Sequence, residues 1–412
     1  MKRAGLWVLC ALVLAGQAPG QKSRAQSRKW RTDPYTRNDP KAMQKAGYIS
    51  FGSFEFGQRG RKVATTEQID EALPKARILW VETRHFRIGS SLAAWAVPND
   101  LQTRRKLRGE LERLAVVLPR VKPRTRVLDP WLRIHLIAMR AEEQYREFLD
   151  WVGVDDSEFP ESADKVVIGR GRYLGYGPYL GMQQKYLLFI TEEVDTYVTY
   201  MQTFTGKRGD YGQRLHFLDI GALFYGVAAK MEGSAFRHDT ALHANLTFNI
   251  AHGFVDGFRH YSYDVPVWIS EGLAHYFERR VSPLYNSFSQ SESVLADTKP
   301  GTRWRLLTRK LITAHKGTPF ARIMTWRDFG QIGYDDHVLI WSRWDYLMSM
   351  GKEKFAEFMF QVKGRIDPKT WIVDQSDLVG ATRDGLRKAY GLTPLSLDEE
   401  WQAWVRKTYP TR

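Results

Sequence analysis

Short apolar runs alternate with longer amphipathic segments over much of the N-terminal half of the chain. The runs that predict strands are 77–88, 133–139, 186–190 and 223–231. Leucines at helical spacing predict a helix over 101–118, and further helices are expected at 141–152 and from residue 192. This alternation predicts a mixed α/β half that spans residues 76–235.

Two helical segments follow in the middle of the chain, at about residues 239–258 and 267–281. A short loop that ends at Pro266 joins them, and together they form a helix pair within 236–301. From 302 to 412 the pattern is predominantly helical. We therefore expect an α+β fold with a mixed-sheet N-terminal half, a central helix pair and a helical C-terminal half.

The first residues combine positive charge with a short apolar run. Lys2 and Arg3 precede the run from Leu6 to Ala15, and small, turn-prone residues follow it, so residues 1–20 read as a secretory signal peptide. No later stretch is apolar over the roughly 20 residues that a membrane-spanning helix needs. The sequence thus predicts an exported protein, periplasmic, at the cell surface or extracellular, with no spanning segment in the mature chain.

The chain is basic, with 61 Lys and Arg against 46 Asp and Glu and a formal net charge of +15. Residues 21–75 begin with a strongly basic stretch and are expected to form a linker. The stretch is either a solvated connection or an arm for an anionic envelope polymer or lipid headgroups. Export argues against nucleic acid as the partner. The glycines of 169–177 do not have the spacing of a phosphate-binding loop.

Candidate chemistry is restricted to imidazoles, carboxylates, amides and hydroxyls, because the only cysteine is Cys10 in the signal segment. In a helix, residues three or four positions apart share a face, so two stripes are expected. The first stripe holds Phe248, His252 and Asp256, and the second holds Glu271, His275 and Glu278. His243 lies nine positions before His252, so it should point to the opposite side.

The segment Trp268-Ile-Ser-Glu271-Gly272-Leu-Ala-His-Tyr, with a histidine nineteen residues before Glu271, resembles the gluzincin branch of zinc metallopeptidases, the peptidase-MA-like domains. In that family one helix carries His-Glu-x-x-His, and the Trp-x-x-Glu-Gly helix supplies the third zinc ligand. The resemblance extends in order and character over about residues 75–405. It implies a zincin-like fold in which His252 and Glu271 stand at two ligand positions.

The sequence departs from the family motif at two positions. Phe248 stands at the first-ligand position and Asn249 at the general-base position. A zinc site needs about three protein ligands, and an amide has no titratable carboxylate for activating water. We therefore expect a catalytically degenerate protein that binds peptide or an envelope polymer, or acts as a scaffold. No cofactor is assigned.

An alternative keeps zinc as a cofactor. His252 and Asp256 on one helix, with Glu271 and His275 on the other, could hold a divalent metal if the helices cross as in the family. An active metallopeptidase would then use His252, Glu271 and a third ligand from outside the family set. Tyr334 and His337 precede a helix that, by the resemblance, would flank the site.

Overall fold

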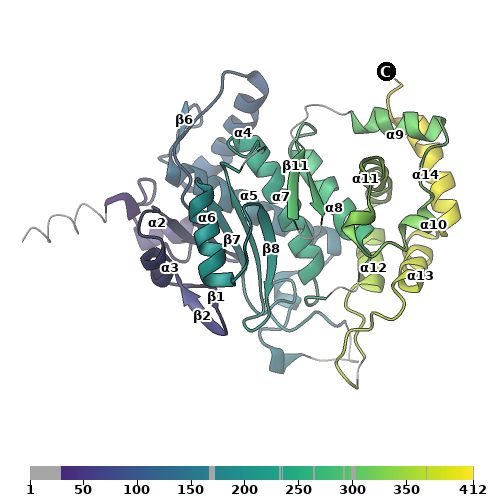
Figure 1. The fold of residues 1–412 in the computed structure, drawn as a ribbon, viewed down its shortest axis with the longest axis horizontal. Helices are drawn as coiled ribbons and strands as arrows, with labels where there is room; N and C mark the ends of the chain where they lie inside the picture. Colours follow the sequence, from purple (N-terminus) through teal and green to yellow (C-terminus); the bar gives the residue numbers. More distant parts are fainter. Residues whose placement is uncertain are drawn as a thin grey trace, which may run out of the picture.

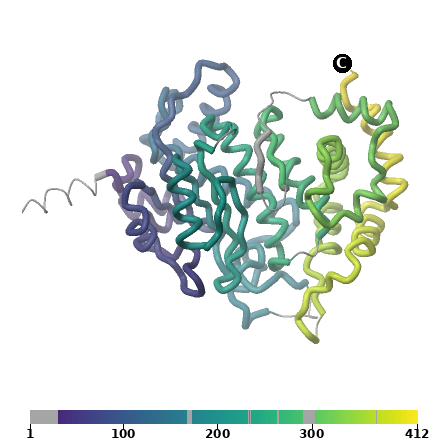
Figure 2. Tube along the Cα trace, viewed as in Figure 1, coloured from purple at the N-terminus to yellow at the C-terminus, as the bar shows by residue number. Residues whose placement is uncertain are grey.

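The computed structural model describes residues 29–166, 172–231, 233, 235–262, 265–290, 293–297, 303–367 and 369–411. Figure 2 traces the chain through these segments. The predicted signal peptide at 1–20 and the start of the glycine-rich stretch at 169–171 lie outside the described residues.

Over the residues that the structure describes, the central sheet is mixed and seven-stranded, with five strands from the N-terminal half and two from residues 286–297. Its strand order is β10-β11-β8-β9-β7-β4-β3. The strands are β3 (Leu79–Glu82), β4 (Phe86–Ser90), β7 (Tyr186–Thr191), β8 (Gly212–Phe217), β9 (Ala222–Ala228), β10 (Asn286–Gln290) and β11 (Ser293–Asp297). The β4–β7 and β7–β9 pairs are parallel, and the remaining neighbours are antiparallel.

Helices cover both faces of this sheet (Figure 1). Side chains alternate along β7, so Tyr186 and Phe189 point to opposite faces. Tyr186 contacts Phe254 of α7 (Asp239–Gly257), with ring centroids 5.2 Å apart. Phe189 stacks on Tyr200 of α6 (Val194–Tyr200) at 4.1 Å. A π-helical turn, η4 (Met201–Thr205), continues α6. The sheet therefore buries apolar side chains on both sides, which accounts for the near-continuous apolar sequence of β7.

The predicted helix pair is confirmed as α7 (Asp239–Gly257) and α8 (Val267–Val281). The helical C-terminal half consists of α9 (Trp304–Thr313), α10 (Phe320–Ile323), α11 (Tyr334–Ser349), α12 (Lys352–Val362), α13 (Leu378–Tyr390) and α14 (Pro394–Thr408). In Figure 1 these helices lie on the far side of α8 from the sheet. The α+β class predicted from the sequence is confirmed.

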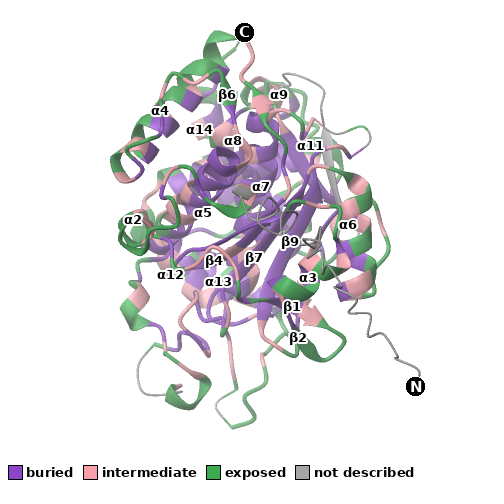
Figure 3. Ribbon diagram, turned by 90° about the vertical axis from the view of Figure 1, so that its left-hand side faces the viewer, coloured by how far each residue is buried: buried purple, intermediate pink, exposed green. Residues whose placement is uncertain are grey.

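Two residues of the Trp-x-x-Glu-Gly segment, Trp268 and Gly272, pack against Trp344 of α11. The rings of Trp268 and Trp344 stack with centroids 5.2 Å apart, and Trp344 Nε1 donates a hydrogen bond to the Trp268 carbonyl at 3.1 Å. A Cβ at Gly272 would lie 2.2 Å from Trp344 Cδ1. Any larger residue at this position would therefore overlap the Trp344 side chain of α11. Figure 3 shows the buried residues gathered along these helices and the sheet.

The prediction of a strand at 133–139 is wrong. These residues belong to α5 (Pro130–Val152), a single long helix that packs beside α7 against the sheet. Asp129 caps its first turn and Pro130 occupies the first helical position, where a missing N–H costs nothing. The helix is buried along most of its length, so an unbroken apolar run marks it just as it would mark a buried strand.

The linker predicted at 21–75 is also incorrect from Lys29 onward. The segment contains η1 (Lys29–Arg31), α2 (Pro40–Lys45), β1 (Glu55–Arg59), β2 (Lys62–Thr65) and α3 (Thr66–Ala72). Asp33 is fully buried, and its Oδ1 lies 3.1 Å from Nε2 of the equally buried His135 on α5. Burial of such polar groups costs free energy unless they are paired, so this contact ties the segment to the core.

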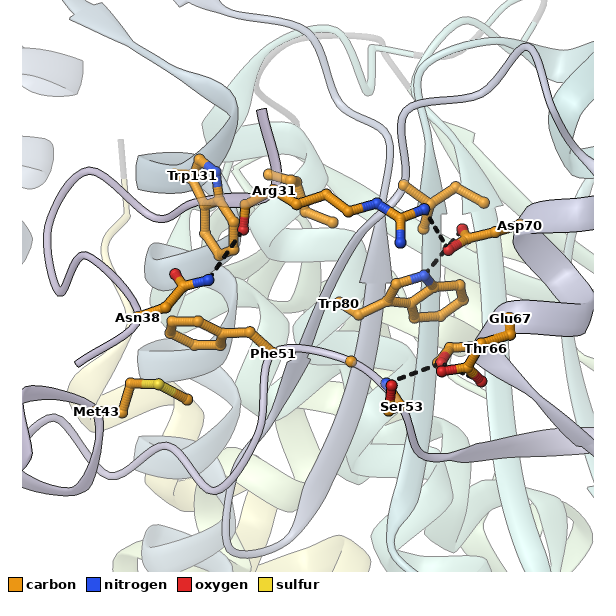
Figure 4. Close-up of a pocket in the computed structure, with 13 residues that line it drawn as sticks. Arg31, Asn38, Met43, Phe51, Ser53, Thr66, Glu67, Asp70, Trp80 and Trp131 are labelled. Carbon is orange, nitrogen blue, oxygen red and sulfur yellow. Dashed lines mark hydrogen bonds and ion pairs between the residues drawn. The ribbon is translucent and has the colours of Figure 1, made fainter. Parts of the chain in front are cut away.

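A small cavity of about 280 Å³ lies between this N-terminal segment and the sheet (Figure 4). Asp70 accepts hydrogen bonds from Arg31 at 2.7 Å and from Trp80 Nε1 at 3.1 Å. The lysines and arginines between residues 31 and 62 are exposed, whereas Tyr48, Phe54 and Phe56 of the same segment are buried.

The remaining elements agree with the sequence in part. The helix expected at 101–118 is α4 (Leu101–Val117), and the apolar run at 77–88 is an antiparallel pair rather than one strand. The pattern missed β8 and the β10–β11 pair. Two short strands, β5 (Trp95–Ala96) and β6 (Val127–Leu128), form a separate pair. Within the described part of the chain, no helix combines the length and apolar character needed to cross a membrane.

Candidate metal site and adjoining cavity

The two residues at the family ligand positions meet across the helix pair. Nε2 of His252 on α7 lies 3.1 Å from Oε2 of Glu271 on α8, and both side chains are buried. Ser289 on β10 donates its backbone N–H to Glu271 Oε1 at 3.0 Å. The carboxylate is therefore fixed from two sides by neighbouring elements.

A second set of nitrogen atoms faces the other oxygen of Glu271. His275 Nε2 lies 3.7 Å from Glu271 Oε1, and His337 Nδ1 from α11 lies 3.3 Å from the same oxygen. The two imidazole nitrogens are 3.1 Å apart. Glu271, His275 and His337 thus form a buried triad with the spacing of metal ligands.

Glu278 stands behind this triad on α8. Its Oε2 lies 3.4 Å from Nδ1 of His275 and accepts the backbone N–H of Ser287 at 3.0 Å. Its Oε1 is buried and has no hydrogen-bond partner among the described residues. The sequence placed Glu278 on the stripe of Glu271 and His275, and the structure confirms that placement.

Burial dominates the electrostatics of the cluster. It raises the pKa of Glu271 to about 7, against the Ser289 N–H and the Arg214 charge, which act to lower it. It also raises the pKa of Glu278 well above its usual range. Burial lowers the pKa of His252 and His275 well below the ordinary value and that of His337 to about 3. At neutral pH the imidazoles are therefore uncharged, the state in which they bind metals.

Phe248 fills the space beside these imidazoles. It is fully buried, and its ring centroid lies 4.8 Å from that of His252 and 5.1 Å from that of His275. The first-ligand position of the family motif is therefore occupied by apolar packing.

Asn249, at the general-base position, is part of a hydrogen-bond chain. Its Oδ1 accepts from Arg214 Nη1 at 2.9 Å, and its Nδ2 donates to the Asn245 carbonyl at 2.9 Å. Arg214 Nη2 donates to Ser289 Oγ at 2.9 Å. This chain joins β8, α7 and β10, and neither Arg214 nor Ser289 was singled out from the sequence. No motif marks them, because their partners lie 35 and 75 residues away.

Asp256 does not join the cluster, contrary to the alternative ligand set of His252, Asp256, Glu271 and His275. It lies one helical turn beyond His252, lines a cavity, and its charge helps burial raise the pKa of Tyr186. His243 points the other way as predicted, with Nδ1 3.5 Å from Glu110 Oε1 on α4.

His337 belongs to the site in a different role from the one expected. The sequence placed it just before a helix that would flank the site, whereas the structure places it within α11 and in direct contact with Glu271 and His275. Tyr334, predicted beside it, accepts a hydrogen bond from Trp304 at 3.2 Å instead.

A cavity of about 710 Å³ adjoins the cluster on the side of β8. Its wall includes Arg214 and His216 of β8, Asn249 of α7, and residues 327–329, which form the turn before and into η5 (Phe329–Gln331). Among the described residues, none of the triad and not His252 lines it. The cavity therefore reaches the general-base position but is separated from the imidazoles.

Comparison with known proteins gives no assignment: no family model matches the chain. No curated protein sequence matches it either. What the structure establishes of the expected metal chemistry is the buried triad of one glutamate and two histidines.

Proposed function

We propose that this protein is an exported, catalytically inactive relative of the gluzincin peptidases that binds an extended peptide segment in the cavity beside β8. The proposal rests on what occupies positions 248 and 249, where this chain differs from the family motif. Phe248 packs against His252, and Asn249 is held by Arg214. A metal-activated water needs both a ligand at the first position and a base at the second, and this chain provides neither.

The edge of β8 supports peptide binding. β11 pairs with β8 only at Gly212 and Gln213. Among the described residues, 214–217 have no ladder partner on that edge, although β9 pairs with them on the other. Four strand residues span about 13 Å. An extended peptide can add to such an edge through main-chain hydrogen bonds, with pockets for alternate side chains.

Charge along the cavity favours an acidic peptide. Lys207, Arg214 and Arg327 line it, against the carboxylates of Asp256 and Asp328. Lys207 and Arg327 are exposed, so they can meet a ligand without rearrangement of the core. Complementary charge chiefly raises the rate of encounter and discriminates between partners.

The test combines a peptidase assay with a binding assay. The mature chain, with zinc added, should not hydrolyse a panel of fluorogenic peptides. Labelled acidic peptides in extended form should bind, and the Lys207→Glu/Arg327→Glu variant should bind them about tenfold more weakly. Lys75→Glu/Arg105→Glu is the matched control, because it reverses two exposed cations outside the cavity and should leave affinity unchanged.

Two results would contradict the proposal. Zinc-dependent hydrolysis that disappears in His252→Ala would establish the metallopeptidase instead, with His252 and Glu271 as ligands. Equal loss of binding in both charge-reversal variants would indicate general attraction to a cationic surface, as for an anionic envelope polymer.

A further inference from the structure

The three ligand atoms of the triad already have the separations that a bound zinc ion imposes. Zinc bonds to nitrogen and oxygen ligands are about 2.0–2.1 Å, so the edges of a tetrahedral ligand set measure roughly 3.3 Å. The observed edges between Glu271 Oε1, His275 Nε2 and His337 Nδ1 are 3.1, 3.3 and 3.7 Å. The three ligand atoms therefore already lie as close to one another as ligands of a single ion do.

Glu278 supplies the partner that a metal-binding histidine commonly has. A ligating imidazole usually donates its other N–H to a carboxylate, which fixes the tautomer. His275 Nδ1 faces Glu278 Oε2 at 3.4 Å, so a proton on Nδ1 leaves the Nε2 lone pair directed at the triad centre. Glu278 itself is held by the Ser287 N–H.

Two buried carboxyl groups, one in the triad and one behind it, have no ion pair with a lysine or arginine among the described residues. Glu271 and Glu278 are both fully buried, and their recorded ion-pair contacts within the described residues are with histidines. Arg214 is engaged with Asn249 and Ser289 instead. Buried carboxylates are normally paired with a cation or coordinated to a metal. A divalent ion at the triad would coordinate Glu271 directly, and Glu278 would accept the Nδ1–H of the ligating His275.

Aromatic rings close the triad off from solvent. The His275 ring lies 5.1 Å from Phe248 and 5.0 Å from Trp304, and the His337 ring lies 4.8 Å from Phe288. The cavity beside β8 does not reach these ligands. A metal held here would link α8 to α11 rather than meet a peptide.

From these observations we infer that Glu271, His275 and His337 bind one divalent transition-metal ion, with Zn²⁺ as the best match, in a closed structural centre. Two imidazoles and one carboxylate suit zinc and its neighbours, whereas Mg²⁺ and Ca²⁺ prefer oxygen ligands. The site shares Glu271 with the family-type ligand set but uses His275, one turn further along α8, and His337 of α11 in place of His252. It does not depend on the proposed peptide binding.

The first experiment measures metal in the purified mature chain after zinc loading and dialysis at neutral pH. We expect about one zinc per chain. Cobalt loading should give visible absorption bands of tetrahedral intensity, a readout on the unmutated protein. A folded chain that retains neither metal would overturn the inference, and the His275–His337 contact would then be an ordinary hydrogen bond.

Variants identify the ligands by competition with a chelator. His337→Ala should weaken zinc binding at least a hundredfold, and Glu278→Gln by about 10- to 100-fold. His315→Ala removes an exposed imidazole elsewhere and should change nothing. His252→Ala should change affinity less than tenfold. Zinc lost in His252→Ala but kept in His337→Ala would overturn the triad in favour of the family-type ligand set, and circular dichroism checks that each variant is folded.

Discussion

Restoring the two missing motif groups tests whether α7 and α8 have the zincin arrangement. We expect the double variant Phe248→His/Asn249→Glu to bind one additional zinc ion through the new imidazole, His252 and Glu271. The Phe248 ring lies 4.8 Å from the His252 ring, so a histidine at that position begins within reach of its partner. His252 Nε2 already contacts Glu271.

The expected stability change follows from burial. Phe248 is fully buried, and exchange of its ring for an imidazole should cost about 2 kcal/mol of apolar burial. A chain of roughly 400 residues unfolds with an entropy near 0.8 kcal/mol/K, so the metal-free variant should melt about 2 to 3 °C lower. Zinc at about 100 times its Kd returns about 2.7 kcal/mol, which restores the Tm.

The assay is a thermal melt over a zinc titration, with bound metal measured in parallel after dialysis. The gain in zinc should disappear when His252→Ala is added and persist when His337→Ala is added. A well-folded double variant with no extra zinc and no zinc-dependent rise in Tm would refute the motif alignment. It would show that positions 248, 252 and 271 do not converge as they do in gluzincins.

The same variant should remain inactive as a peptidase. Arg214 Nη1 lies 2.9 Å from Asn249 Oδ1, so a glutamate at that position would form an ion pair with the guanidinium. An adjacent cation lowers the pKa of a carboxyl group and weakens it as a base. Zinc binding without hydrolysis is therefore the expected result, and hydrolysis would show that Arg214 does not control this position.

Three further substitutions test the packing. Gly272→Ala should lower the free energy of unfolding by about 1–3 kcal/mol in chemical denaturation, because its Cβ would overlap Trp344. Burial raises the pKa of Asp239, but Arg140 outweighs it and brings the pKa to about 2. That contribution of about 2 kcal/mol is present above pH ~4 and lost as pH falls through about 2, so Asp239→Asn should flatten the acid-denaturation curve there. Asp33→Ala should speed tryptic cleavage of 29–45 roughly tenfold if that segment opens locally.

The fold class and the helix pair were predictable because both depend on local pattern. Apolar periodicity and Pro266 marked α7 and α8 to within a residue or two. Packing explains the glycine of the Trp268 segment, because the Trp344 side chain occupies the space that a Cβ at Gly272 would need. Helix boundaries and periodicity depend on residues close together in the sequence, so they can be predicted without tertiary information.

The N-terminal segment shows where composition misleads. Its lysines and arginines suggested a solvated linker, yet Tyr48, Phe54 and Phe56 are buried in the core. Those aromatic residues were a signal against disorder that net charge concealed. The net charge of a segment indicates which side chains face solvent. Its aromatic residues indicate whether its other side is buried against the core.

The sequence identified most of the residues of the site, but it did not predict which of them lie in contact. His252 and Glu271 were expected to meet and do so at 3.1 Å. The place of His337 was not, because it joins His275 from 62 residues away on a separate helix. Asp256 was grouped with His252 by helical spacing alone. It lies one helical turn beyond His252, where it lines the cavity instead.

Two properties that coincide in an active zinc peptidase are separated in this chain. Asn249 and Arg214 line the cavity, and a hydrogen-bond chain that needs no metal joins them to Ser289. The metal-type ligands Glu271, His275 and His337 lie beside Phe248, and none of them lines the cavity. A peptide in the cavity and a metal at the triad would therefore occupy the molecule independently. It follows that chelation should lower the Tm without changing peptide affinity, whereas reversal of Lys207 and Arg327 should change peptide affinity without releasing metal.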